Sequence, residues 1–171
     1  MRIGLIGLGE MGSEIGRSFV ENGIEVISVY DGRSRTSKER ASSYGIKDAL
    51  TIENVSKKSD IIISVIPPDK ALYTADQYSK YISDDGPIYC DLNAISTMTA
   101  KDVKNLLGER KVNYVDGSIV GGPPKENYSP RVYLSGKKAK NLNFLSGKGI
   151  NIVILKGSDF QASAIKMVYA E

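Results

Sequence analysis

Three glycines near the start of the chain have the spacing of a phosphate-binding turn. Gly7, Gly9 and Gly12 follow the apolar run 3–6, and the apolar residues after them recur at helical spacing. In a strand–turn–helix unit of this kind, the first glycine makes the turn, the second lets a pyrophosphate approach the backbone, and the third lets helix and strand pack closely. The helix N-terminus then offers free N–H groups to the anion. We therefore predict a dinucleotide site at Gly7, Leu8, Gly9, Glu10, Met11 and Gly12.

A polar loop after the second expected strand bears on which dinucleotide is bound. Asp31 stands where an NAD-specific site places a carboxylate for the ribose hydroxyls, and taken alone it favours NAD. Gly32 leaves room, however, while Arg33 and Arg35 can pair with a 2′-phosphate and Ser34 can donate a hydrogen bond to it. We predict NADP, with NAD less favoured, and this requires Asp31 to turn away from the phosphate. The alternative is a solvated basic loop before a helix.

The chain contains no histidine, and this limits the chemistry open to it. The absence removes Ser-His-Asp nucleophilic chemistry and histidine-based zinc sites, and we expect no metal. It also removes the histidine acid/base that many 2-hydroxy acid dehydrogenases use. Proton transfer must therefore use Lys, Tyr, Asp, Glu, Cys or water.

Alternating strand and helix patterns predict an α/β fold. The near-continuous apolar run 61–66 is typical of a strand that is covered on both faces. Ligands of parallel open sheets lie beyond the carboxyl ends of the strands, so Ile66 and Pro67 should border the cofactor, unless the prolines only end the strand. We predict a doubly wound, mainly parallel sheet with the glycine turn at its switch point. The expected strands are 3–6, 25–30, 61–66, 88–92, 111–115, 131–134 and 151–155. The first expected helix follows Gly12, and the second begins at 34–37 and ends at 45, with Thr36 or Ser37 as its cap. Further helices are expected at 70–81, 97–107 and 137–145, and the last begins at a Ser158–Asp159 cap.

Several short motifs together resemble one family. Residues 7–12, 22–24 and 29–31 look like the opening of the β-hydroxyacid dehydrogenases, which include 3-hydroxyisobutyrate dehydrogenase and 6-phosphogluconate dehydrogenase. Within that superfamily, residues 31–34 and 162–167 look most like its uncharacterised NADP-binding members. The resemblance implies a Rossmann-type cofactor domain and a second, all-helical domain that closes the active site and forms a homodimer.

The resemblance also implies a domain boundary near the end of the chain. We expect a dinucleotide-binding domain at 1–157 and the start of a truncated interdomain helix at 158–171, with the second domain absent. A chain of this form should bind the cofactor but be catalytically weak alone.

One lysine on this last helix is the candidate acid/base. Lys166-Met167-Val168 is similar to the catalytic Lys-Met-Val of 6-phosphogluconate dehydrogenase. The resemblance implies that Lys166 moves the proton of the substrate hydroxyl as the hydride leaves. Ala170 stands where the family has an asparagine, and a solvent-facing lysine on a surface helix is the alternative.

Two further segments resemble substrate-binding parts of the family. Residues 91–96 are similar to its Asp-x-Ser-Thr-x-Ser segment, which lies near the nicotinamide and the substrate; Asn93 replaces a serine there and Ser96 keeps its hydroxyl. The resemblance therefore implies that Asn93 binds the cofactor as well as the substrate. Asn93 can donate and accept hydrogen bonds at once, although an Asx turn or a helix cap would also explain it. Residues 116–122 are similar to the family's substrate loop, where the backbone N–H groups of Gly121 and Gly122 could hold a carboxylate. Val120 lacks the hydroxyl of the family's serine, and a stiff turn is the alternative.

Composition sets the outer bounds on function. The chain has 171 residues and a net charge of +3 with scattered basic residues, so nucleic-acid binding is disfavoured. No apolar run is long enough to cross a bilayer, and Met1 leads directly into the first expected strand, so we expect a cytoplasmic protein that does not bind membranes. The single cysteine, Cys90, is expected to be buried and inert.

These observations together favour one function. We predict an NADP-dependent oxidoreductase of the 3-hydroxyacid or 6-phosphogluconate dehydrogenase type, which transfers a hydride between NADP and a small hydroxy acid with Lys166 as acid/base. The alternative is a non-enzymatic NADP-binding module or an inactive relative, for which Val120 and Ala170 are the arguments.

Overall fold

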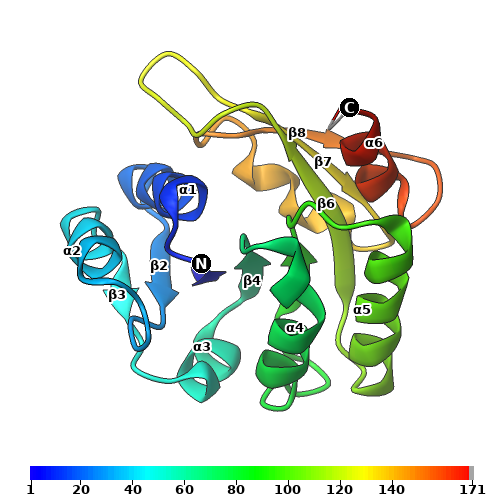
Figure 1. Cartoon of the computed structure of the whole chain (residues 1–171), viewed down its shortest axis with the longest axis horizontal. Helices are drawn as coiled ribbons and strands as arrows, with labels where there is room; N and C mark the ends of the chain where they lie inside the picture. Colours follow the sequence, from blue (N-terminus) through cyan, green and yellow to red (C-terminus); the bar gives the residue numbers. More distant parts are fainter. Residues whose placement is uncertain (170–171) are drawn as a thin grey trace.

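An eight-stranded sheet runs through the middle of the computed structural model, which describes residues 1–169 apart from the side chains of Met167 and Tyr169 (Figure 1). The strand order is β3-β2-β1-β4-β5-β6-β7-β8, and every neighbouring pair is parallel except β6 and β7. The predicted doubly wound, mainly parallel fold is confirmed. The strands are β1 Arg2–Ile6, β2 Glu25–Ser28, β3 Lys47–Asp48, β4 Ile61–Ser64, β5 Ile88–Asp91, β6 Tyr114–Val120, β7 Arg131–Ser135 and β8 Asn151–Ile154.

Helices cover both faces of this sheet (Figure 1). On one face, α1, α2 and the 3₁₀ segment η2 pack on the sheet, and α3, α4 and α5 pack on the other. The central strands supply both cores because successive side chains point to opposite faces: Ile61 and Ile63 of β4 face the first group of helices, and Ile62 faces the second. The helices are α1 Glu10–Glu21, α2 Arg35–Ser43, α3 Ile52–Lys58, α4 Ala71–Ser79, α5 Thr97–Glu109 and α6 Gln161–Tyr169, with 3₁₀ turns η1 Pro68–Lys70 and η2 Ala139–Leu145.

Strand β6 corrects the predicted boundary between strand and loop. The sequence placed a strand at 111–115 and a substrate loop at 116–122, whereas β6 begins at Tyr114 and continues to Val120. The added residues pair with β7 in an antiparallel ladder from Asp116 opposite Ser135 to Val120 opposite Arg131. Most of the substrate-loop motif therefore lies within the strand, and only Gly121 and Gly122 lie beyond its end.

Two helical predictions also need correction, and one helix was not predicted. Helix α2 is capped by Ser34, whose Oγ accepts from the Ser37 N–H at 3.1 Å, and neither Thr36 nor Ser37 is the cap. Helix α3 was not predicted; it begins after Thr51, whose hydroxyl accepts from the Asn54 N–H at 3.1 Å. The segment 139–145 is a 3₁₀ helix and not an α-helix.

Among the residues that the structure describes, no helix is both long enough and apolar enough to cross a membrane.

Candidate functional site

The three glycines of the turn have three different environments. Gly7 adopts φ +106°, and a Cβ on it would lie 2.0 Å from the carbonyl oxygen of Val65. A Cβ on Gly12 would lie 2.4 Å from the carbonyl oxygen of Gly7, so α1 can approach the turn only without a side chain there. At Gly9, by contrast, an added Cβ would meet nothing within 4 Å in the described part of the chain. The turn is therefore closed at its two ends and open in the middle, which is the shape that a pyrophosphate needs.

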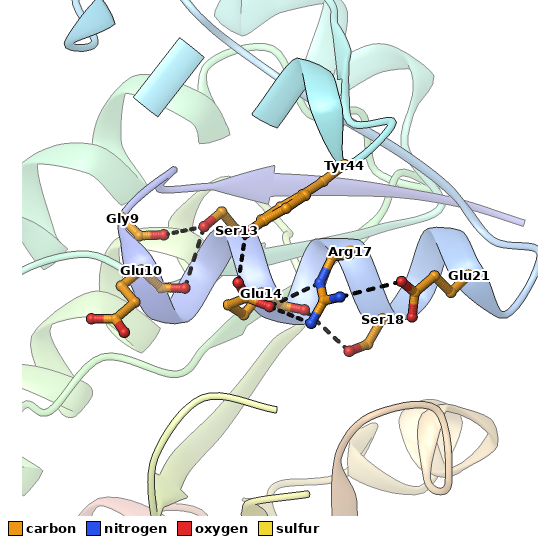
Figure 2. Close-up of polar contacts among 8 residues, drawn as sticks. All are labelled: Gly9, Glu10, Ser13, Glu14, Arg17, Ser18, Glu21 and Tyr44. Atoms are coloured by element: carbon orange, nitrogen blue, oxygen red, sulfur yellow. Dashed lines mark hydrogen bonds and ion pairs between the residues drawn. The ribbon is translucent and has the colours of Figure 1, made fainter. Parts of the chain in front are cut away.

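Polar contacts hold the first turn of α1 in place (Figure 2). The Ser13 hydroxyl donates to the Gly9 carbonyl at 2.7 Å, on the helix side of the turn. At the next residue, the Glu14 carboxylate accepts from Arg17 Nε at 2.9 Å and from the Tyr44 hydroxyl at 2.7 Å. This carboxylate raises the pKa of Tyr44 through its hydrogen bond and its charge. Because Tyr44 directly follows α2, the contact ties α2 to the helix that carries the phosphate-binding turn.

A cleft of about 770 Å³ opens beside the turn. It lies at the carboxyl ends of β1, β2 and β4, where the predicted switch point of the sheet falls. Its lining includes most of the predicted cofactor residues: Gly7, Leu8, Gly9, Gly32, Arg33, Ser34, Ile66 and Pro67. Four predicted cofactor residues lie outside this lining: Glu10, Met11 and Gly12 form the first turn of α1 behind the cleft, and Asn93 follows β5.

At the ribose edge of the cleft, the two arginines of the polar loop have different environments. Arg33 lines the cleft, together with Ser34 and Ser37. Burial raises the pKa of Tyr78, which also lines the cleft, to about 12, and the Arg33 charge opposes this rise. Arg35 points elsewhere, since its side chain is 92% exposed and pairs with Glu39 at 2.8 Å.

Asp31 also lines the cleft. The residue type that favours NAD therefore remains at the same edge as Arg33, and the expectation that Asp31 turns away gains no support.

Sequence reasoning missed one wall of the cleft. After Pro67, the chain enters η1 and α4, which contribute Asp69, Lys70, Tyr73, Thr74, Gln77 and Tyr78. The available signal was positional: α4 follows β4 at the switch point, so polar residues in its first turns should face the ligand.

Asn93 joins the ends of two strands. It is 3% exposed; its Oδ1 accepts from the Ile66 N–H at 2.7 Å, and its Nδ2 donates to Ser64 Oγ at 3.2 Å. Its own N–H donates to the Asp91 carboxylate at 2.8 Å, so the Asx turn at this place is made by the Asp91 side chain and not by that of Asn93. Asn93 thus fixes Ile66 at the cleft through β4 and β5, and a direct contact with cofactor or substrate stays a prediction.

Ser96 has a structural contact of its own. It caps α5 by accepting from the Thr99 N–H at 3.1 Å. The hydroxyl is exposed at the carboxyl side of β5, and its predicted role in substrate binding is not tested by this contact.

A buried carboxylate docks the last helix on the sheet. Asp116 of β6 accepts from the Ser163 N–H at 2.8 Å and from the Ser163 hydroxyl, so it lies at the N-terminus of α6, where negative charge is favoured. Ser118, two residues along the strand, donates to the Ala162 carbonyl at 2.8 Å. Burial raises the pKa of Asp116, and the hydrogen bonds from Ser163 oppose the rise. Asp116 therefore belongs to the support of the site, although the motif placed it in a substrate loop.

The contacts of α6 bring Lys166 to the functional edge of the sheet. Its Nζ donates to the carbonyl of Ile119, near the carboxyl end of β6. Because β6 is parallel to β5, and β5 to β4, this end lies on the same edge as the cleft, two strands from β4. Ala170, the position of the family's asparagine, lies outside the described residues.

Of the two substrate-loop glycines, the first is tightly packed and the N–H of the second already has a partner. Gly121, with φ +118°, packs so closely that an added Cβ would lie 2.0 Å from the Tyr128 hydroxyl. That hydroxyl accepts from the Gly122 N–H at 3.2 Å, so a carboxylate would have to displace it to use this donor.

These features define a Rossmann-type domain that binds a nicotinamide dinucleotide. Residues 2–144 match the family model of the NAD binding domain of 6-phosphogluconate dehydrogenase, and the chain belongs to this family. The resemblance noted from the short motifs is thereby confirmed.

Similar proteins extend the comparison over almost the whole chain. A 28.5 kDa protein of Methanothermus fervidus, described as uncharacterised, is 33% identical over 168 residues, 98% of this chain and 63% of that protein. A 3-hydroxyisobutyrate dehydrogenase of Dictyostelium discoideum, named as probable and mitochondrial, is 25% identical over 88% of this chain and 49% of its own length. A solved protein of unknown function, itself described as similar to 3-hydroxyacid dehydrogenases, superposes with a TM-score of 0.88 and 30% identity over 99% of this chain and 63% of that one. The chain thus spans about half to two thirds of the length of these relatives.

Proposed function

We propose that this chain is the cofactor domain of an oxidoreductase that transfers a hydride between NADP and a small 3-hydroxy acid, with Lys166 as acid/base. The observation that carries the proposal is the place of Lys166, whose amine meets the Ile119 carbonyl on the sheet edge where the cleft opens. In open α/β sheets this edge is where ligands bind, so an acid/base there can reach a substrate beside the cofactor.

The residues of the cleft fit a dinucleotide with a 2′-phosphate. The open side of Gly9 and the N-terminus of α1 suit the pyrophosphate, and Arg33 with the Ser34 and Ser37 hydroxyls suits the 2′-phosphate. When bound, the nicotinamide supplies the hydride chemistry. Asp31 at the same edge is the feature that opposes the NADP assignment.

The protein's own part in the reaction is proton transfer. In the direction of alcohol oxidation, the neutral amine of Lys166 accepts the hydroxyl proton of the substrate, and in reduction the ammonium returns it. The Ile119 carbonyl holds the amine near the end of β6 until a substrate hydroxyl takes its place as partner. Asn93, Ser96, Gly121 and Gly122 are the candidate substrate contacts around it.

A second function, a non-enzymatic NADP-binding module, is favoured by one specific observation. Val120 offers no hydroxyl where the family has a serine, and the neighbouring Gly122 N–H is already bonded to Tyr128. Carboxylate recognition at this loop would then be weak, while the cofactor cleft stays intact.

Titration of Arg33→Ala with NADPH and NADH tests the cofactor. A charge-assisted hydrogen bond contributes about 1.5–3 kcal/mol, so this substitution should lower the preference for NADPH about ten- to a hundredfold. Arg35→Ala is the matched control, because its guanidinium is exposed and pairs with Glu39. Tighter binding of NADH by the wild type, or an unchanged preference in Arg33→Ala, would show that the site is not built for NADP.

Hydride transfer to a panel of 3-hydroxy acids tests the reaction. In a complete enzyme that carries the second domain, Lys166→Met should lower the rate about a hundredfold or more while leaving NADPH affinity nearly unchanged, and exposed Lys156→Met is the control. Equal losses in the two variants would remove the acid/base assignment. In the same complete form, NADPH binding without turnover on any substrate would favour the non-enzymatic module.

A further inference from the structure

Arg40 reaches from α2 to the glycine turn. Its Nη2 donates to the carbonyl oxygen of Leu8 at 2.8 Å, between residues 32 positions apart in the sequence. We propose that Arg40 is a positioning residue, which holds the turn so that the Gly9 N–H faces the pyrophosphate of the cofactor. The inference rests on the proposed binding of a dinucleotide and adds a residue that the glycine motif does not contain.

The geometry of a single peptide unit carries the first step. In a trans peptide the C=O and the following N–H point in opposite directions, so fixing one fixes the other. Arg40 holds the C=O of Leu8, and the N–H on the other side of that peptide belongs to Gly9. Leu8 and Gly9 both line the cleft, and the space beside Gly9 is open. The bond therefore aims a backbone donor towards the place where a phosphate can approach.

The second step concerns the cost of keeping Arg40 at this place. Its Nε is buried and has no hydrogen-bond partner within the described part of the chain. A buried N–H without a partner is unfavourable, and a side chain as flexible as arginine can usually avoid it. The contact with Leu8, a charge-assisted hydrogen bond, offsets this cost and keeps the side chain against the turn.

The third step is that α2 contacts each part of the site. Its cap, Ser34, lines the ribose edge of the cleft. Arg40 lies near its end, and Tyr44 follows one turn later with its hydroxyl bonded to Glu14 of α1. One short helix therefore joins the ribose edge, the glycine turn and the helix behind that turn. Since Arg40 does not itself line the cleft, it acts on the pyrophosphate through the Leu8–Gly9 peptide.

The test compares ligands with and without a pyrophosphate. Arg40→Met keeps the aliphatic stem and removes the donors, whereas Arg40→Lys keeps the charge and a donor. Arg35→Met is the control, an exposed arginine on the same helix. Dissociation constants for NADPH, NADH and 2′-AMP are measured for each protein, with thermal unfolding as the check on folding.

Arg40→Met should bind both dinucleotides about ten- to a hundredfold more weakly, bind 2′-AMP as the wild type does, and be partly rescued in Arg40→Lys. Equal losses for 2′-AMP and the dinucleotides, in a folded variant, would overturn the positioning role and leave a structural one. If Arg40→Met fails to fold, Arg40→Gln decides, because its side chain is uncharged and too short to replace the bond to the Leu8 carbonyl: a loss confined to the dinucleotides supports the role and no such loss overturns it. Unchanged dinucleotide binding in Arg40→Met overturns the inference alone, whereas a wild type that binds neither dinucleotide overturns the proposed function with it.

Discussion

Replacing Asp91 by asparagine should change how the stability of this protein depends on pH. The Asp91 carboxyl is fully buried at the end of β5, where its Oδ1 accepts from the Asn93 N–H at 2.8 Å. Its Oδ2 is buried and finds no hydrogen-bond partner among residues 1–169. Burial raises the pKa of Asp91 from 3.8 to about 7; the Asn93 N–H opposes the rise, and the charge of Asp116 adds to it.

The size of the effect follows from the two pKa values. Between about pH 4 and pH 7 the unfolded chain has lost this proton while the native state still holds it, so the free energy of unfolding falls as pH rises. The contribution of the group is fully present below its unfolded pKa and is lost as pH rises through its folded pKa near 7. The two values differ by about three, and each pKa unit corresponds to about 1.4 kcal/mol, which gives a loss of at most about 4 kcal/mol.

Asp91→Asn removes this titration and keeps an oxygen to accept from Asn93. The variant should therefore gain stability over the wild type at about pH 8 and approach it at about pH 4, as measured by urea unfolding at both values. Asp102→Asn, an exposed carboxylate on α5, is the control and should follow the wild type. Parallel pH profiles for the wild type and Asp91→Asn would refute the reasoning, because they would mean that Asp91 is already ionised in the native protein.

The remaining predictions concern the turn and a helix cap. Gly9→Ala should weaken NADPH binding with little change in the melting temperature, because its Cβ enters open space on the side of the pyrophosphate. Gly12→Ala should weaken binding and also destabilise the fold by about 1–3 kcal/mol, since its Cβ would lie 2.4 Å from the Gly7 carbonyl oxygen; identical behaviour of the two variants would contradict this division of roles. Ser96→Ala should cost about 1 kcal/mol in urea unfolding through loss of the bond from the Thr99 N–H, and no loss would mean that the hydroxyl does not cap α5.

The glycine turn could be predicted because its geometry depends on missing side chains. Gly7 needs a positive φ and Gly12 needs a close contact, and each requirement leaves a glycine at a fixed spacing in the sequence. The presence of the central strands could be predicted from buried apolar runs such as 61–66, because a strand covered on both faces has no polar side. In both cases the structural reason was local, and a local sequence pattern was sufficient.

The extension of β6 could not be predicted for the opposite reason. Asp116, Gly117 and Ser118 are poor strand formers, and each is kept by a contact with a distant segment. Asp116 and Ser118 bond to α6, and a Cβ on Gly117 would lie 2.4 Å from the Leu92 side chain. Tertiary packing therefore overrides the local preference at this strand.

Asn93 shows the same limit within the candidate site. The motif indicated a contact with cofactor or substrate, but its side-chain amide joins Ser64 and Ile66, which lie 29 and 27 positions earlier. The residue type shows that Asn93 can donate and accept hydrogen bonds, but it does not show which groups are its partners. A direct contact of Asn93 with cofactor or substrate stays a prediction.

The position of Lys166 depends on buried polar groups whose partners the sequence did not reveal. Its own contact is one bond to the Ile119 carbonyl, but the helix that carries it is fixed one turn earlier by Asp116. An ionised carboxylate accepts both bonds from Ser163 and interacts favourably with the N-terminus of α6, whereas a protonated one loses acceptor capacity and the charge. Because burial raises the pKa of Asp116, this anchor weakens at a higher pH than an ordinary aspartate would allow. How firmly the fold holds Lys166 therefore depends on the protonation state of Asp116, which bonds to Ser163 one helical turn before Lys166.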